Sequence, residues 1–232
     1  MLNRGKRTSQ NRAADLPNAP RSTNWVLGPS LLIVAVALCV LLWLGQPLFC
    51  HCGSLLFWIS DAAGSHTSQH FTDPYSITHF QHGLVLCLFI GWIFEKWTAS
   101  TRAVSWQLTL TVLIEAGWEV LENTPLVIDR YRTATVAVGY RGDALINSLG
   151  DIVCCILGWI VARYFGWRWT IVLFVAIEIA LIIIIRDSLL LSILMLTSPV
   201  EGIREWQQGE SLSASTNPTP RNPLPSCWYR LQ

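Results

Sequence analysis

The stretch Glu115-Ala116-Gly117-Trp118-Glu119-Val120-Leu121-Glu122 ends an otherwise apolar run that begins near Ala103. Its three glutamates are spaced i, i+4 and i+7, so a helix places them on one face. Three acids on a helix of membrane-spanning length are costly unless that face lines a protein interior or a wet cavity. The stretch therefore predicts a helix packed among others, with polar groups facing these glutamates.

The composition favours a membrane protein. Of 232 residues, 52% are hydrophobic and only 13% are charged, whereas soluble domains have about 25% charged residues. The net charge of +1 and the lack of a basic block give no indication of a nucleic-acid partner. The partner that the composition does predict is the lipid bilayer.

Five apolar runs are long enough, at roughly 20 residues, to cross a bilayer. We predict helices at about 28–49, 76–97, 103–123, 143–164 and 169–197. The predicted fold class is thus all-α, a polytopic membrane helix bundle spanning residues 25–200. Residues 1–24 are polar and are expected to form a disordered cytoplasmic tail, and residues 201–232 a flexible C-terminal tail with a short polar helix near Ile203–Trp206.

The Lys/Arg distribution predicts an N-in, C-out orientation. Five basic residues precede the first run, and no Lys or Arg occurs between Arg21 and Lys96. Cytoplasmic loops carry an excess of these residues, so the first connection is expected outside. The connection 126–141 is also placed outside but holds three arginines. Arginines there are more readily explained by pairing or binding than by topology.

Polar residues of four predicted helices fall in the same, outer leaflet. His79 and His82 open the second helix, and the glutamate face closes the third. Asp143, Asn147 and Asp151, spaced i, i+4 and i+8, open the fourth. Arg186 lies in the outer half of the fifth. This convergence predicts a polar, acidic cavity that opens to the outer face.

We assign three sets of candidate residues to this cavity. The candidate acid–base residues are Glu119, Asp151, His82 and Glu115. The candidates for binding an anionic substrate are Arg130, Arg132, Arg141, Asn147 and Arg186. The candidate metal ligands are His79, His82, Glu119 and Asp143, so a divalent metal ion is left open as a cofactor.

Structural interpretations stand beside these assignments. Glu115 could be a structural acid bonded to a neighbouring helix, and Glu122, nearest the surface, could simply be solvated. Arg186 could form a structural ion pair with Asp151 or Glu115. Cys50-His51-Cys52 lacks standard zinc-ligand spacing and is interpreted as loop.

Several segments resemble a family of uncharacterised bacterial inner-membrane proteins. They are His79-Phe80-Gln81-His82-Gly83, Glu115-x-x-Trp118-Glu119-x-x-Glu122-Asn123, Tyr140-Arg141-Gly142-Asp143-x-x-x-Asn147-x-x-x-Asp151 and Arg186-Asp187. The resemblance covers roughly residues 25–208. It implies a multi-pass protein of the bacterial cytoplasmic membrane and supplies no activity. A more remote resemblance to VanZ-like membrane proteins departs from that family in the paired histidines and in Glu122.

Three functional hypotheses remain open. The first is a membrane-embedded enzyme acting on a lipid-linked or amphiphilic small molecule. The second is a proton-coupled or small-solute carrier, because intramembrane Asp, Glu and His also mark proton relays. The third is a non-catalytic envelope assembly factor whose buried charges specify helix packing. The sequence does not distinguish oligomeric states.

Overall fold

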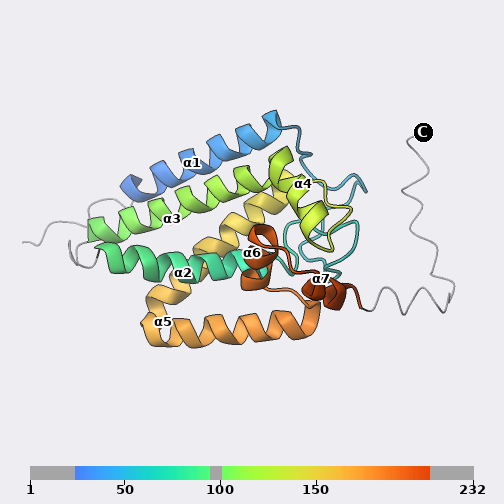
Figure 1. Ribbon diagram of the computed structural model, residues 1–232. Helices are drawn as coiled ribbons and strands as arrows, with labels where there is room; N and C mark the ends of the chain where they lie inside the picture. Colours follow the sequence, from blue (N-terminus) through green and yellow to red (C-terminus); the bar gives the residue numbers. More distant parts are fainter. Residues whose placement is uncertain (1–23, 95–100, 210–232) are drawn as a thin grey trace, which may run out of the picture.

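The computed structural model describes residues 24–94 and 101–209, and within them the fold is all-helical (Figure 1). The helices are α1 (Asn24–Trp43), α2 (Ser76–Phe94), α3 (Thr101–Glu122), α4 (Pro125–Ala134), α5 (Leu145–Ile185), α6 (Leu189–Thr197) and α7 (Glu201–Gln208). Within the described residues, β-type pairing is limited to an isolated bridge between Trp58 and Thr72. The predicted all-α class is confirmed; the tails 1–23 and 210–232 lie outside the described residues.

The first predicted helix is shorter than expected at its C-terminal end. α1 ends at Trp43 rather than near residue 49. Gly45 adopts a left-handed backbone (φ 89°), and the N–H groups of Gly45 and Gln46 close the end on carbonyls of the last helical turn. This is the usual glycine C-cap, which an apolar run alone does not disclose. Residues 44–75 then form a long irregular connection.

Glycines bring α2 and α5 into close contact. A Cβ atom at Gly83 would lie 1.9 Å from the carbonyl oxygen of Cys155, and one at Gly158 would lie 2.0 Å from that of Phe80. Only residues without a Cβ allow two helix backbones to approach so closely. This crossing places the histidine face of α2 beside the acidic start of α5.

Two apolar clusters hold the helices together. Ala37, Ala116 and Ile152 join α1, α3 and α5. Leu84, Cys87, Trp159 and Ala162 form a second cluster between α2 and α5, with Leu108 of α3 packed against it. We call this second group the apolar plug. It lies on α2 and α5 beyond the histidines and Asp151, counted from the starts of both helices.

The fourth and fifth predicted helices differ from the observed elements. α5 runs from Leu145 to Ile185 and contains one non-helical residue, Gly166 (φ 75°, ψ 171°), where the chain turns back. The predicted helix 169–197 is wrong as a continuous element because Arg186 caps α5 in the left-handed region (φ 56°). After this break Ser188 caps α6, its side chain accepting a hydrogen bond from the Leu191 amide.

One end of the bundle carries the irregular segments and the short helices (Figure 1). α4 lies within the arginine-bearing connection and starts at Pro125, which favours the first helical turn. α7 occupies 201–208, so these residues form the expected short polar helix rather than flexible tail. The starts of α2 and α5 and the ends of α1 and α3 also meet at this end.

Two of the described helices are long and apolar enough to cross a membrane. They are α2, over Ser76–Ile93, and α5, over its full length of 41 residues. α1 contributes a shorter apolar segment, Gly28–Trp43. By length and composition this is weak evidence of membrane association, so the five-span topology stays a prediction.

Candidate functional site

A buried network joins the histidines of α2 to the first glutamate of α3. Nδ1 of His79 lies 2.6 Å from Oε1 of Glu115, and Nδ1 of His82 lies 3.0 Å from Oε2. Because an ionised carboxylate only accepts hydrogen bonds, both imidazoles donate to it. The rings of His79 and His82 also contact each other edge to face at 5.0 Å. Glu115 thus orients both histidines, as expected for an acid bonded to a neighbouring helix.

Glu119 is fully buried and has no hydrogen-bond partner at either carboxyl oxygen. Its Oε1 lies 3.1 Å from Nδ1 of His79, but the N–H group of that ring is directed at Glu115. Oε2 of Glu122 and Oδ1 of Asp151 are also buried without a partner. Buried polar groups are nearly always paired, so these orphaned oxygens are sites where a proton, a water molecule or a bound ligand would complete the hydrogen bonding.

Glu122 is not solvated, contrary to the sequence-based alternative. Its exposed fraction is 9%, because α4 folds over the end of α3. The hydroxyl group of Tyr131 on α4 lies close to its carboxyl group. The prediction failed because α4 was not recognised in the connection after Pro125.

Asp143 is held by a separate set of hydrogen bonds. Its Oδ2 accepts from the side-chain amide of Asn123 at 2.9 Å, and its Oδ1 accepts from the hydroxyl of Tyr140 at 2.9 Å. Its backbone N–H donates to Oδ1 of Asn123 at 2.6 Å. These bonds satisfy Asp143 and fix the start of α5, so it is a poorer candidate for a metal ligand than the residues of the glutamate face.

Two groups of three side chains bring metal-ligating atoms within 4.8 Å of one another, and both contain His79. The first adds His82 and Glu115, and the second adds Glu119 and Glu122. In the first group both carboxyl oxygens of Glu115 already accept hydrogen bonds from the two imidazoles. The second group contains the orphaned oxygens of Glu119 and Glu122. The second group therefore has the greater capacity to bind a cation.

A cavity of about 1480 Å³ reaches this centre. Its walls include His79, His82, Glu115, Glu122 and Asp151, together with apolar residues of α2, α5 and α6. Loop residues 46–47, part of 50–70, and 135–143 form much of the rest of its described lining. Glu119 and Asn147 are not part of that lining. They are buried behind it, at 0% and 1% exposure.

The arginines fall into two groups. Arg130 donates to the carbonyl of Leu196 at 2.7 Å, and Arg132 donates to the carbonyl of Tyr140 and pairs with Asp129 at 3.3 Å. Arg130 thus ties α4 to α6, and Arg132 ties α4 to the loop that follows α4. Arg141 and Arg186 line the cavity. Arg186 donates to the carbonyl of Trp206 at 3.2 Å, because the break after α5 points it at α7 rather than at the expected partners Asp151 or Glu115.

Glu178 is a buried acid that the sequence analysis missed. Its Oε1 accepts hydrogen bonds from the side-chain amide of Gln81 at 2.9 Å and from the Leu189 amide at 3.1 Å, and its Oε2 accepts from the Leu190 amide at 3.3 Å. Glu178 thereby caps the N-terminus of α6 from the second half of α5 and links both to α2. Its position inside an apolar run was the available signal.

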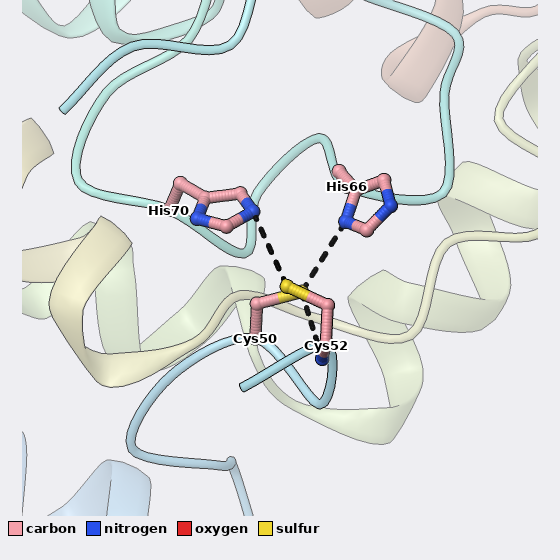
Figure 2. A group of neighbouring side chains, drawn as sticks. All are labelled: Cys50, Cys52, His66 and His70. Carbon is pink, nitrogen blue, oxygen red and sulfur yellow. Dashed lines mark hydrogen bonds between the residues drawn. The ribbon is translucent and has the colours of Figure 1, made fainter. Parts of the chain in front are cut away.

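A second cluster of ligating side chains lies in the connection between α1 and α2 (Figure 2). Cys50 and Cys52 face His66 and His70, with all four donor atoms within 4.8 Å of one another. The sequence interpretation of Cys50-His51-Cys52 as plain loop missed this cluster. Its signal was the combination of Cys-x-Cys with His-x-x-x-His, the two motifs being separated by thirteen residues.

The fold and the buried centre define a helical protein with a histidine–carboxylate site beneath a large cavity. Residues 41–209 match the family described as protein of unknown function, DUF2585. The chain belongs to this family, and the resemblance to uncharacterised bacterial proteins is thereby confirmed.

Curated relatives are UPF0314 proteins. That of Sphingopyxis alaskensis is 37% identical over 187 residues, which is 81% of this chain and 96% of the relative. The relative from Novosphingobium aromaticivorans is 38% identical over 78% of this chain and 93% of its own length. The relative from Rhizobium johnstonii is 35% identical over 85% of this chain and 98% of its own length. No solved structure matches. The resemblance to VanZ-like proteins is not shown by these comparisons.

Proposed function

We propose that this protein is a multi-pass enzyme of the bacterial cytoplasmic membrane, acting on an anionic amphiphile at a buried, metal-binding histidine–carboxylate centre. The observation that carries the proposal is the set of orphaned carboxyl oxygens on Glu119, Glu122 and Asp151 beside His79. These atoms lie at and just behind the inner wall of a cavity large enough for a lipid head group and part of its chains.

The distribution of polarity supports a membrane location. Ionisable groups fill the interior, whereas large apolar side chains cover the outside: Ile183 and Ile184 are each 75% exposed. A soluble protein buries such residues to gain roughly 25 cal/mol per Å² of apolar area. The reverse arrangement is stable in lipid. α1, α2, α3 and the two halves of α5, separated at Gly166, then supply five spans, with the cavity end outside.

The charge balance supports a bound cation. Four buried carboxyl groups (Glu115, Glu119, Glu122 and Asp151) surround two imidazoles, and the ion pairs of this centre are made to those imidazoles. Burying uncompensated negative charge is strongly unfavourable. A divalent cation bound by His79, Glu119 and Glu122 would compensate part of this charge and satisfy the orphaned oxygens of Glu119 and Glu122 together. A donor set of carboxylates with one imidazole suits Mn²⁺ or Zn²⁺.

The residues around this group suit acid–base chemistry. A bound divalent metal would act as a Lewis acid toward a carbonyl or phosphoryl oxygen. Glu115 orients His79 and His82, as acids do that hydrogen-bond metal-ligating histidines. His82, which is part of the cavity wall, is placed to pass a proton to or from a substrate. Asp151, whose Oδ2 lies 4.0 Å from Nε2 of His79, remains the candidate acid on the α5 side.

The cavity lining supports an amphiphilic substrate. Arg141 and Arg186 supply positive charge on its wall, and Val85, Ile114 and Phe174 supply apolar surface. Arginine binds carboxylate and phosphate groups through paired N–H donors. We therefore place the anionic head group near Arg141 and Arg186 and the hydrocarbon chain along the apolar wall.

The test is a turnover assay on native lipids. Wild type and Glu119→Gln protein, purified in detergent and supplied with Mn²⁺ or Zn²⁺, are incubated with bacterial inner-membrane lipid extract, and the lipids are compared by mass spectrometry. We expect one lipid class to be consumed by wild type alone. Native mass spectrometry should show weaker retention of that lipid by Arg141→Gln than by Arg168→Gln, which alters an exposed arginine outside the cavity lining. Identical extracts after both incubations would refute the enzyme and favour the assembly factor.

A proton-coupled carrier is the alternative that the orphaned acids also suit, because protons could neutralise them. A carrier requires a polar path across the bilayer, and the apolar plug of Leu84, Cys87, Trp159 and Ala162 interrupts such a path. Cysteine probes at Leu84 and Ala162 that become labelled by a water-soluble reagent in any state would favour the carrier. Persistent protection would favour the enzyme.

A further inference from the structure

Four side chains from two separate segments meet in the connection between α1 and α2. Figure 2 shows Cys50 and Cys52 on one segment facing His66 and His70 on the other. Sγ of Cys50 lies 3.3 Å from Nδ1 of His66, and Sγ of Cys52 lies 3.9 Å from Nε2 of His70. Cys50 and His70 are buried, at 7% and 2% exposure. The cluster is therefore an interior feature of the connection rather than a chance surface contact.

The backbone holds these two segments together independently of the four side chains. The Cys50 amide donates to the carbonyl of Gln69 at 3.1 Å. Between the histidines, Ser68 adopts the left-handed region (φ 62°), which non-glycine residues rarely occupy. Its amide donates to Oδ2 of Asp73 at 2.7 Å, and its carbonyl accepts from the Ala144 amide at 2.8 Å. Such strain persists where the surroundings fix it, and it often marks a functional site.

The spacing of the donor atoms matches a tetrahedral metal site. Zn–S bonds of about 2.3 Å and Zn–N bonds of about 2.0 Å place tetrahedral donors roughly 3.3–3.8 Å apart. The two cysteine–histidine distances, 3.3 and 3.9 Å, are close to this range, and no pair exceeds 4.8 Å. A small contraction of the loop completes the geometry.

The chemistry of the four side chains is also suitable. Thiolate sulfur and neutral imidazole are the forms that bind metal ions.

We propose that Cys50, Cys52, His66 and His70 bind one Zn²⁺ ion in a structural site. Two thiolates and two imidazoles form one of the usual donor sets for structural zinc, and four protein ligands leave no open position for catalysis. The ion pins residues 50–70 beside the cavity that these residues help to line. Binding through Nε2 of His70 moves the ring proton to Nδ1, so the hydrogen bond from the Leu56 amide to Nδ1 is given up.

The sequence spacing agrees with this assignment in all but one interval. The pattern is Cys-x-Cys-x₁₃-His-x₃-His, whereas the common two-cysteine, two-histidine zinc motif has two to four residues between the cysteines. The short interval is accommodated because the Cys52 amide bonds back to Sγ of Cys50 at 3.4 Å. The competing chemistry is a Cys50–Cys52 disulfide, which would remove both thiolates.

Zinc content and zinc coordination test the proposal. The full-length protein is purified in detergent in the Glu119→Gln background, so that the intramembrane centre proposed above does not contribute metal. X-ray absorption at the zinc edge should show sulfur and nitrogen neighbours in the unmodified loop, with about one zinc per chain. Cobalt-substituted protein should show a thiolate-to-cobalt charge-transfer band. This readout needs no loop variant, so it does not depend on whether such variants fold.

Matched variants complete the test. Cys50→Ser and His70→Ala should lose most of the zinc and the charge-transfer band, whereas His51→Ala and Cys39→Ser should retain both. Three results would each overturn the proposal. The zinc could have only oxygen and nitrogen neighbours, or the zinc content could be equal with Cys50→Ser and with the unmodified loop. The intact mass could also be lower by the two hydrogens of a Cys50–Cys52 disulfide. None of these results bears on Glu119 chemistry, so the two proposals fail separately.

Discussion

Nδ1 of His79 lies 2.6 Å from Oε1 of Glu115, joining the first turn of α2 to the third turn from the end of α3. The other oxygen of the same carboxylate accepts from His82. A single buried acid therefore fixes two imidazoles, and it leaves Glu119, one turn further along, without a hydrogen bond. This division of roles underlies the account of the site.

Replacement of Glu115 by glutamine should destabilise the protein. The amide has one acceptor oxygen and no charge, so it cannot accept from both imidazoles with the same strength. Hydrogen bonds to charged groups contribute about 1.5–3 kcal/mol each, and we expect a loss of this order in thermal unfolding in detergent. Glu205→Gln, on the exposed side of α7, is the control and should unfold like wild type. Equal stability of the two variants would contradict the anchoring role of Glu115.

Gly83→Ala should disrupt the crossing of α2 and α5. The added methyl would meet the backbone oxygen of Cys155 at 1.9 Å, and a backbone atom cannot move aside as a flexible side chain can. Overpacking of this kind costs about 1–3 kcal/mol. Gly91→Ala is the matched control on the same helix, since its new methyl would meet nothing within 4 Å. A lower melting temperature for both variants alike would refute a specific close contact.

Asp187, between α5 and α6, should make stability depend on pH. Burial raises the pKa of its carboxyl group from 3.8 to about 6, despite hydrogen bonds from Ser188, Ser192 and Tyr75. A carboxyl group with a raised folded-state pKa stabilises the fold fully below pH 3.8 and loses that stabilisation as pH rises through 6. The shift corresponds to roughly 3 kcal/mol.

Asp187→Asn should remove this contribution. The variant should show a flatter dependence of unfolding free energy on pH between 4 and 6 than wild type, and it should be the more stable of the two at pH 7. Asp129→Asn, on the exposed side of α4, serves as the control. A variant that keeps the wild-type slope would show that another group titrates in this range.

Glu178→Ala should loosen the N-terminus of α6. The substitution removes the acceptor for the Leu189 and Leu190 amides and for Gln81. Hydrogen–deuterium exchange should accelerate at residues 189–191 by about tenfold or more, in line with the loss of a cap worth ~1–2 kcal/mol. Exchange in α1 is the internal control. Uniform acceleration throughout the protein would indicate global unfolding instead.

The sequence predicts the glutamate face, the histidine pair and their meeting because helical periodicity turns spacing into position. The helices of 76–97 and 103–123 are recovered as α2 and α3 with small shifts at their ends. His79, Glu115 and Glu119 accordingly lie together. Their chemical roles stay predictions, since periodicity places a side chain without stating what it binds.

Other features depend on tertiary contacts that spacing does not encode. The break at Gly166 and the left-handed cap at Arg186 divide runs that hydropathy joins. Glu178 lies in an apolar run, and only the fold supplies the helix end that it caps. The Cys50–His70 cluster needs two loop segments to fold back on each other, which no periodic pattern reports.

The most direct test of the proposed histidine–carboxylate centre is its metal content. Protein with the Cys50→Ser substitution, which removes the loop site, is purified in detergent, equilibrated with Mn²⁺ or Zn²⁺, and analysed by elemental mass spectrometry with and without Glu119→Gln. We predict about one tightly held ion per chain in the Cys50→Ser protein and an affinity at least tenfold weaker when Glu119→Gln is added. The control substitution Glu205→Gln should leave the bound ion in place. Equal metal content in the Cys50→Ser protein with and without Glu119→Gln would contradict the account.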